Sequence, residues 1–359
     1  MYLLGVFILL ILAFWGFERF YLRGNGVSIY PPPSDPDAVQ RFTQTGGPGP
    51  EHQQLIKAVR ELTLKISIGR RHQNLQAART AFDAISDGLE FKSDFLPVDA
   101  GGIPAEWVIA PGADGSRRML YIHGGGFVVG SPKSHRNITS KFSEITGCAV
   151  LAIDYRLMPE HLYKDCIEDC RSAYHWILSN GPDGTGEIRQ LFIGGDSAGG
   201  NLTLSLIAWI RDSQLRAPEA VVALSPLTDV TFSGASLHDN LDTDIMLKPF
   251  MKPLTRLPQF IKSWYVYFTY KVRPCSPVVS PLLGDLAGLP PTLVQASEAE
   301  MLLDDARRYV YKACACGSPA KMQTWPDMLH IWQIFDPQIP QAVEAWGEIG
   351  KFLQGHASA

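Results

Sequence analysis

The stretch GDSAG at residues 195–199 lies between two apolar runs, a short one at 191–194 and a longer one at 201–210. The short run predicts a buried strand and the longer run predicts a helix, so the serine stands at a strand-to-helix turn. In the pattern G-x-S-x-G the glycines leave room for a turn this sharp, and the serine stays exposed at the helix N-terminus. We therefore interpret Ser197 as a nucleophile; the alternative is a serine in an ordinary tight glycine turn.

The stretch HGGGF at residues 123–127 follows another short apolar run. Three consecutive glycines cost conformational entropy, so their presence needs a structural reason. A serine nucleophile supplies one, because backbone N–H groups must come within about 3 Å of the oxyanion that forms on the attacked carbonyl. Gly124, Gly125 and Gly126, together with Ala198, are the predicted donors. A phosphate-binding loop is the competing interpretation, but its G-x-x-x-x-G-K-[ST] or G-x-G-x-x-G spacing is absent here.

Strand and helix patterns alternate from Phe95 onward. The predicted strands are mostly continuous apolar runs, as in a parallel sheet covered on both faces. They run over residues 106–110, 119–123, 149–154, 191–194, 220–224, 292–296 and 321–324. The predicted helices between them run over 135–146, 163–178, 201–211, 302–316 and 339–353. This alternation predicts a doubly wound α/β sheet in one domain over residues 51–359.

Two stretches depart from this alternation and are predicted to form a cap. Residues 51–90 carry apolar side chains at helical spacing, and residues 230–275 are apolar and aromatic without a clear central strand. An insertion after the C-terminal end of a strand is where such folds build a lid over the site. The alternative is that these side chains are the ordinary core of a helical excursion.

The N-terminus is apolar without interruption over residues 2–17. This run predicts an N-terminal membrane anchor over residues 1–24, because no basic residue precedes it as in a signal peptide. Arg19 and Arg23 follow the run, but two charges leave the side of the membrane open. Residues 25–50 are rich in Pro, Gly, Ser and Thr and are predicted to be a linker. The protein is therefore predicted to be membrane-associated.

The overall composition limits the class of partner. The chain has 32 basic and 36 acidic residues, a net charge of −4 and no basic run, which argues against nucleic-acid binding. Its six cysteines lack the C-x-x-C spacing of a zinc site and are interpreted as core thiols. Nothing in the composition indicates an oligomeric state.

Five motifs, taken in order, resemble those of the hormone-sensitive-lipase-like esterases. They are HGGGF at 123–127, DYRLMPEH at 154–161, GDSAGGN at 195–201, SPLTD at 225–229 and DMLH at 327–330. The resemblance covers about residue 95 to the C-terminus. It implies an α/β-hydrolase with a mostly parallel, eight-stranded sheet and a helical cap. It also implies hydrolysis of short to medium acyl esters without metal or cofactor. With its predicted anchor, the layout is also similar to arylacetamide deacetylase-like membrane esterases.

The resemblance also implies the partners of Ser197. The base lies in the loop after the last strand, where His330 occurs, and the acid follows the strand at 292–296. The four carboxylates in that region are Glu298, Glu300, Asp304 and Asp305. Placing the sequence EMLLD on the D-P-L-x-D pattern of the family puts Glu300 at the acid position, with Asp304 as the alternative. The acid would hold the tautomer of His330 and stabilise its imidazolium.

Two other functions are compatible with the same motifs. An amidase or deacetylase would use the same three residues and differ only in how the leaving amine is protonated. A non-catalytic binding module would keep the pocket, as in plant gibberellin receptors, which lose the histidine. Because a serine, a histidine and an acid are all present, we favour an enzyme. Asp154, Arg156 and Glu160 are interpreted as structural.

Overall fold

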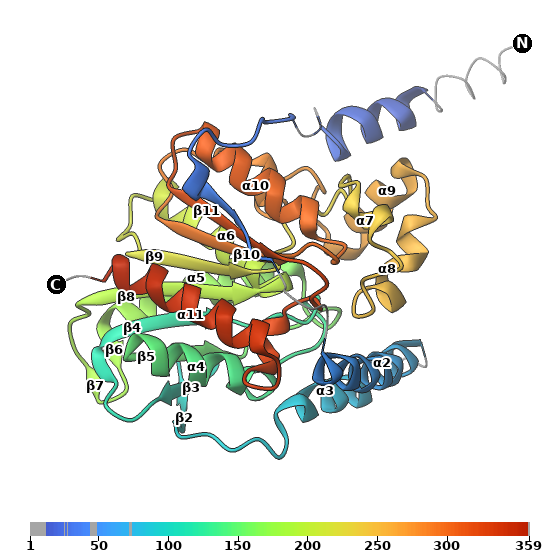
Figure 1. Ribbon diagram of the computed structural model, residues 1–359. Coiled ribbons are helices and arrows are strands. Elements are labelled where there is room, and N and C mark those ends of the chain that lie inside the picture. Colours follow the sequence, from blue (N-terminus) through green and yellow to red (C-terminus); the bar gives the residue numbers. More distant parts are fainter. Residues whose placement is uncertain (1–11, 25, 27, 44–48, 72–73, 358–359) are drawn as a thin grey trace, which may run out of the picture.

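The computed structural model describes residues 12–24, 26, 28–43, 49–71 and 74–357. A nine-stranded sheet in the order β1-β11-β10-β9-β8-β4-β5-β3-β2 forms its centre (Figure 1). The strands are β1 (Val39–Arg41), β2 (Asp94–Asp99), β3 (Pro104–Ile109), β4 (Asp114–Ile122), β5 (Cys148–Ile153), β8 (Gln190–Asp196), β9 (Ala220–Leu224), β10 (Thr292–Ser297) and β11 (Ala320–Trp325). Neighbours pair in parallel except β2 with β3 and β3 with β5. The predicted α/β class and mostly parallel sheet are confirmed.

Helices cover both faces of this sheet. They are α4 (Arg136–Thr146) and α11 (Pro340–Gly355) on one face, and α5 (Tyr163–Ser179), α6 (Ser197–Asp212) and α10 (Leu303–Ala315) on the other. Successive residues of one strand serve different faces: in β4, Leu120 and Ile122 join the core under α5 and α6, whereas Met119 and Tyr121 join the core under α4 and α11. This two-sided burial explains why the central strands contain continuous apolar runs.

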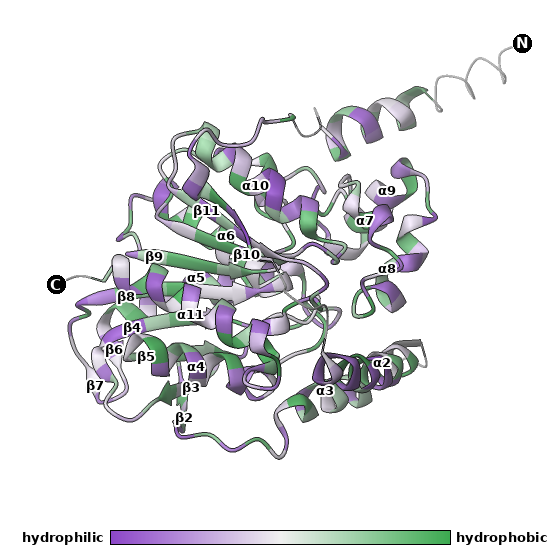
Figure 2. Ribbon diagram, in the orientation of Figure 1, coloured by the Kyte–Doolittle hydropathy of each residue, from purple (hydrophilic) through white to green (hydrophobic). Residues whose placement is uncertain are grey.

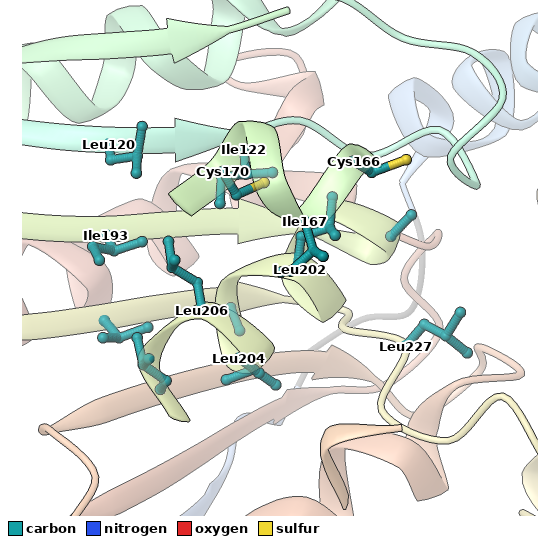
Figure 3. Close-up of a cluster of buried hydrophobic side chains, with 14 of the residues drawn as sticks. Leu120, Ile122, Cys166, Ile167, Cys170, Ile193, Leu202, Leu204, Leu206 and Leu227 are labelled. Atoms are coloured by element: carbon teal, nitrogen blue, oxygen red, sulfur yellow. The ribbon is translucent and has the colours of Figure 1, made fainter. Parts of the chain in front are cut away.

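Figure 3 shows the larger of these cores. Side chains from β4 and β8 meet side chains from α5 and α6, and the labelled residues carry only aliphatic or thiol side chains. Those from the strands are Leu120, Ile122 and Ile193, and those from the helices include Cys166, Ile167, Cys170, Leu202 and Leu206. Figure 2 shows the complementary pattern, with hydrophilic residues on α10 and α11 beside largely hydrophobic central strands.

The two outermost strands were missed by the sequence analysis. β1 lies inside the predicted linker and pairs with β11, and Arg41 at its end forms two contacts of 2.6 and 2.7 Å with Glu298. β2 is largely exposed and contains Pro97, which is tolerated at a sheet edge because the missing N–H faces no partner strand. Neither strand has the apolar signature of a buried one. The sheet therefore has nine strands instead of eight.

Two groups of helices lie at the end of the sheet where the parallel strands finish (Figure 1). The first group is α2 (Pro50–Arg71) and α3 (Leu75–Asp83), and the second is α7 (Ser236–Asp239), α8 (Lys248–Thr255) and α9 (Gln259–Tyr270). They occupy the two stretches, 51–90 and 230–275, that break the strand–helix alternation.

The predicted N-terminal anchor over residues 1–24 is contradicted. Residues 1–11 lie outside the described residues, and in the described part of the chain no helix is long and apolar enough to cross a bilayer. Residues from Leu12 to Leu22 are helical and pack on α9, where the rings of Phe14 and Phe17 stack on Trp264 at centroid distances of 4.7 and 5.5 Å. The buried carboxylate of Glu18 accepts a hydrogen bond of 3.0 Å from Ser263. The prediction of a membrane-associated protein is corrected accordingly.

Candidate active site

Ser197 stands at the turn from β8 into α6. Its φ angle is 51°, an uncommon value for a non-glycine residue, and its side chain is partly exposed between buried neighbours. A Cβ atom on Gly199 would lie 2.0 Å from the carbonyl oxygen of Ile122, and one on Gly195 would lie 2.6 Å from the same oxygen. The glycines therefore allow α6 to start directly against β4, and this close approach holds the serine at the turn.

Three side chains form a continuous hydrogen-bonded chain at this turn. His330 Nε2 lies 2.9 Å from Ser197 Oγ, and His330 Nδ1 lies 2.5 Å from Glu300 Oε2. Glu300 is fully buried, and its other oxygen accepts a hydrogen bond of 3.0 Å from the N–H of Ser297. The three residues follow β8, β11 and β10, whose C-terminal ends meet at one edge of the sheet.

The electrostatics of His330 reflect this arrangement. Burial lowers the pKa of His330, but the hydrogen bond and the negative charge of Glu300 outweigh it, and Asp244 adds in the same direction, so the pKa is raised above its ordinary value. The imidazolium form is thus stabilised at a position where the ring also contacts the serine hydroxyl. A histidine in this setting can accept a proton from Ser197.

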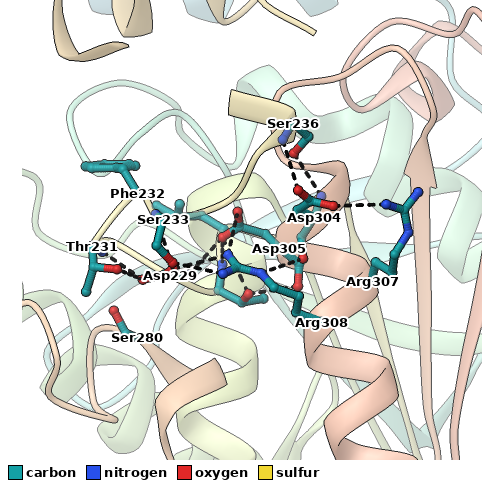
Figure 4. Close-up of polar contacts among 12 residues, drawn as sticks. Asp229, Thr231, Phe232, Ser233, Ser236, Ser280, Asp304, Asp305, Arg307 and Arg308 are labelled. Carbon is teal, nitrogen blue, oxygen red and sulfur yellow. Dashed lines mark hydrogen bonds and ion pairs between the residues drawn. The ribbon is translucent and has the colours of Figure 1, made fainter. Parts of the chain in front are cut away.

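The other carboxylates after β10 point elsewhere. Asp304 accepts a hydrogen bond of 2.9 Å from the N–H of Ser236 and pairs with Arg307 at 2.9 Å (Figure 4). Asp305 accepts the N–H groups of residues 228 and 229. Glu298 accepts two hydrogen bonds from Arg41 of β1. Of the four carboxylates, only Glu300 is hydrogen-bonded to His330.

Three of the four predicted oxyanion donors lie at the serine, two from the glycine loop and one from α6. Gly125, Gly126 and Ala198 line the same cavity as Ser197. Gly124 does not: its N–H donates to Asp196 Oδ1 at 2.9 Å, so its assignment as an oxyanion donor is corrected. The N–H of Ala198 lies in the first turn of α6, where a helix offers no acceptor of its own.

Asp196 is a structural partner that the sequence analysis did not single out. This fully buried carboxylate accepts hydrogen bonds from Tyr121 Oη at 2.5 Å and from Gly124, and His135 Nε2 lies 3.4 Å from its second oxygen. Burial alone would raise the pKa of Asp196, but His135 and Tyr121 hold it below its ordinary value. The residue before the serine therefore ties the glycine loop to the turn.

His123, the histidine of the HGGGF motif, has a different place. Its Nδ1 lies 2.7 Å from the carbonyl oxygen of Gly124, and its ring stacks on Tyr155 at a centroid distance of 4.4 Å. Burial lowers the pKa of His123 to about 3, so the ring is neutral. His123 shapes the glycine loop and does not contact Ser197.

Two further residues that the sequence analysis missed hold the acid loop. Asp244 is 4% exposed and accepts hydrogen bonds from the N–H groups of Leu247 at 2.9 Å and Met301 at 2.8 Å. Asn240 donates to the carbonyl oxygen of Glu300 at 2.8 Å. Both lie in the stretch predicted as cap, and no motif distinguishes them there. They connect that stretch to the loop that presents Glu300.

Ser197 and His330 open into an apolar cavity of about 230 Å³. Its walls come from α2, α8, α9 and the loops at the strand ends. The lining side chains include Val59, Leu62, Ile66, Phe82, Phe127, Leu227, Phe232, Phe250, Met251, Leu254, Tyr265, Tyr270 and Leu302. Such walls suit an apolar ligand group beside Ser197 and His330.

Neither the described histidines and cysteines nor the described carboxylates form a group of three or more that could hold a metal ion. All six cysteines are free thiols, and three of them are buried.

Comparisons with known proteins agree with this site. A family model described as the alpha/beta hydrolase fold matches residues 119–334. An acetyl-hydrolase of Streptomyces hygroscopicus is 34% identical over 83% of this chain and 96% of its own length. A carboxylesterase/phospholipase of Mycobacterium tuberculosis is 34% identical over 70% of this chain and 66% of its own length. The crystal structure of an esterase from the bacterial hormone-sensitive lipase family superimposes with a TM-score of 0.74 at 33% identity, covering 86% of this chain and 99% of that one. The chain therefore belongs to the alpha/beta hydrolase family, in its hormone-sensitive-lipase-like branch of carboxylic ester hydrolases.

Proposed function

We propose that this enzyme hydrolyses short to medium acyl esters with Ser197 as nucleophile, His330 as general base and Glu300 as the acid of the triad. The observation that carries the proposal is the hydrogen-bonded chain from Ser197 through His330 to Glu300, which opens into an apolar cavity. Nucleophile and base within hydrogen-bond reach, with the base oriented by a third group, is the arrangement that serine hydrolysis requires.

The mechanism follows from these positions. Ser197 Oγ attacks the ester carbonyl while His330 Nε2 takes its proton, and Glu300 stabilises the imidazolium through Nδ1. The N–H groups of Gly125, Gly126 and Ala198 stabilise the oxyanion. When the tetrahedral intermediate collapses, the alcohol leaves with the proton from His330. Water then attacks the acyl-enzyme with His330 again as base, which releases the acid and restores the serine.

The acyl preference is inferred from the cavity. We propose that α2, α3, α8 and α9 form a cap, because the first, third and fourth of these helices supply much of the apolar wall and α3 supplies Phe82. A volume of about 230 Å³ lies below the roughly 300 Å³ at which pockets for drug-sized ligands begin. This supports a short or medium acyl group more than a long one.

The test is hydrolysis of p-nitrophenyl esters from acetate to palmitate by the full chain and by Ser197→Ala. We expect an optimum at short or medium chains that is lost by several orders of magnitude in Ser197→Ala while the fold is kept. Equal rates for both proteins would refute the role of Ser197. If the folded wild type hydrolysed p-nitroanilides and no ester, the ester proposal would fail and an amidase would replace it.

A further inference from the structure

A second, polar cavity of about 330 Å³ lies behind one wall of the active site. It is formed by Arg23 from the N-terminal segment, the loop over residues 231–235, His238 of α7, and Gln259 and Lys262 of α9. None of its described lining residues is a carboxylate, whereas three of them carry basic nitrogen atoms. Neither the catalytic proposal nor the cap uses this cavity.

Lys262 is the unusual member of this group. Its side chain is 5% exposed, and its one hydrogen bond among the described residues is to the carbonyl oxygen of Phe232 at 3.3 Å. No ion pair of 4.0 Å or less joins its ammonium group to a carboxylate of the described residues, although a lysine has three donors and is rarely buried unpaired. Burial lowers the pKa of Lys262, and the more distant charge of Asp229 opposes this only in part.

The nearby acidic groups are already occupied. Asp229 accepts the hydroxyl groups of Thr231 and Ser233, each at 2.5 Å, and pairs with Arg308 at 3.1 Å (Figure 4). Glu18 is engaged by Ser263, and its distance to Arg23 is 3.4 Å. These carboxylates lie outside the lining of the cavity. The lining therefore keeps an excess of positive charge.

Arg23 contributes a second incompletely used donor. The Nε atom of Arg23 is buried and has no hydrogen-bond partner among the described residues. The guanidinium contacts Glu18 only at 3.4 Å, through Nη2. An anion in the cavity could accept hydrogen bonds from Lys262, Arg23 and the ring of His238. These hydrogen bonds would replace those to water that the ammonium group lost on burial.

Phe232 links this cavity to the active site. The residue lines both cavities, and Figure 4 shows its ring projecting away from the Asp229–Arg308 contacts. Its φ angle is 55°, so the loop holds the ring in place at a conformational cost. A ligand behind Phe232 would thus contact a residue that also forms the substrate wall.

We propose that this cavity binds a small anionic group, a carboxylate or a phosphate, through Lys262 and Arg23. The group could belong to a free ion or to one end of the ester substrate. Both sources present the same chemistry to the cavity, and the experiment separates them.

The first measurement is calorimetric titration of inorganic phosphate into the full chain carrying Ser197→Ala, at constant ionic strength with chloride as reference. We expect saturable binding that weakens about ten-fold or more with an added Lys262→Met, because one charge-assisted contact is lost. Lys252→Met, on the exposed side of α8, is the matched control and is expected to bind as the parent does. Arg23→Gln, at a half-exposed site, provides a second weakened variant if Lys262→Met does not fold. Absence of saturable binding, or equal affinity in all variants, overturns the proposal.

The second measurement separates the two sources with Ser197 intact. If the anion belongs to the ester, Lys262→Met raises KM for 4-nitrophenyl hemisuccinate about ten-fold relative to p-nitrophenyl butyrate without changing kcat. If it is a free ion, that ratio stays the same while phosphate still binds. Because the phosphate titration needs no turnover, a failure of the esterase proposal would leave this test intact.

Discussion

Replacing Glu300 by glutamine tests the assignment of the triad acid. The Glu300 carboxylate is buried and lies 2.5 Å from His330 Nδ1, so in the wild type it accepts the Nδ1 proton and leaves Nε2 free to face Ser197. A glutamine keeps the size and can still accept the N–H of Ser297. Its amide group, however, can donate to Nδ1, and this favours the tautomer that carries the proton on Nε2. That tautomer cannot take the proton of the serine.

The expected loss is large. The equivalent exchange in the chymotrypsin-type triad lowers kcat about 10⁴-fold through the wrong tautomer, which corresponds to roughly 5.5 kcal/mol of barrier. We expect Glu300→Gln to lower kcat by the same order of magnitude. In Glu300→Asp the side chain is shorter by one carbon–carbon bond of about 1.5 Å, which would lengthen the 2.5 Å contact to about 4 Å. This variant should therefore also be strongly impaired.

The assay is steady-state hydrolysis of p-nitrophenyl butyrate, with circular dichroism and thermal melting to verify the fold. Asp304→Asn is the matched control, because Asp304 bonds to Ser236 and Arg307 and does not contact His330. We expect its kcat to stay within a few-fold of wild type. A folded Glu300→Gln variant with at least a tenth of wild-type kcat would refute the assignment, as would an equal loss in Asp304→Asn.

Three further predictions follow from the same contacts. Glu300 raises the pKa of His330 above its ordinary 6.5 in spite of burial. Because the protonated ring accepts no proton, kcat/KM measured from pH 5 to 9 should fall as the pH drops through a value above 6.5. A flat pH profile would contradict this prediction. Gly125→Ala should lower kcat by about 10²-fold or more at an unchanged global fold. The reason is that the new Cβ would lie 2.1 Å from the carbonyl oxygen of Val129 and would displace the glycine loop. A wild-type kcat in this variant would show that the loop is not the oxyanion site. Asp244→Ala should lower the free energy of unfolding, measured in urea, by about 1–3 kcal/mol and should also lower kcat. The reason is that the buried N–H of Met301, next to Glu300, loses its acceptor. An unchanged stability would show that Asp244 does not hold the Glu300 loop.

The local features of the site were predictable because a few neighbouring residues determine them. At 195–199 the glycines, the serine and the two flanking apolar runs predict a strand-to-helix turn, and the distance from a Cβ at Gly199 to β4 explains why a larger residue would not fit. The strands that are buried on both faces could be predicted from their continuous apolar runs. His330 was found because it follows the last such strand within a motif.

Other features depended on segments far apart in the chain. β1 has a polar, three-residue sequence and becomes a strand only because β11, some 280 residues later, offers it an edge. The N-terminal helix was predicted as a membrane anchor from its apolar composition, yet the same aromatic rings pack on α9. Composition records that a surface is apolar but not which other surface covers it.

Which of the candidate donors and acids lie beside Ser197 and His330 also depended on the tertiary structure. Gly124 and Gly125 are neighbours in one glycine run, but the N–H of Gly124 donates to Asp196, which comes 72 residues later. Glu300 and Asp304 were both open from the sequence, and Glu300 reaches His330 because Asn240 and Asp244 hold its loop. The sequence by itself determined the turn, the glycine loop and the layering of the sheet, since these follow from local sterics and burial. The tertiary structure decided which polar groups meet, because a hydrogen bond depends on positions that only the packed chain defines.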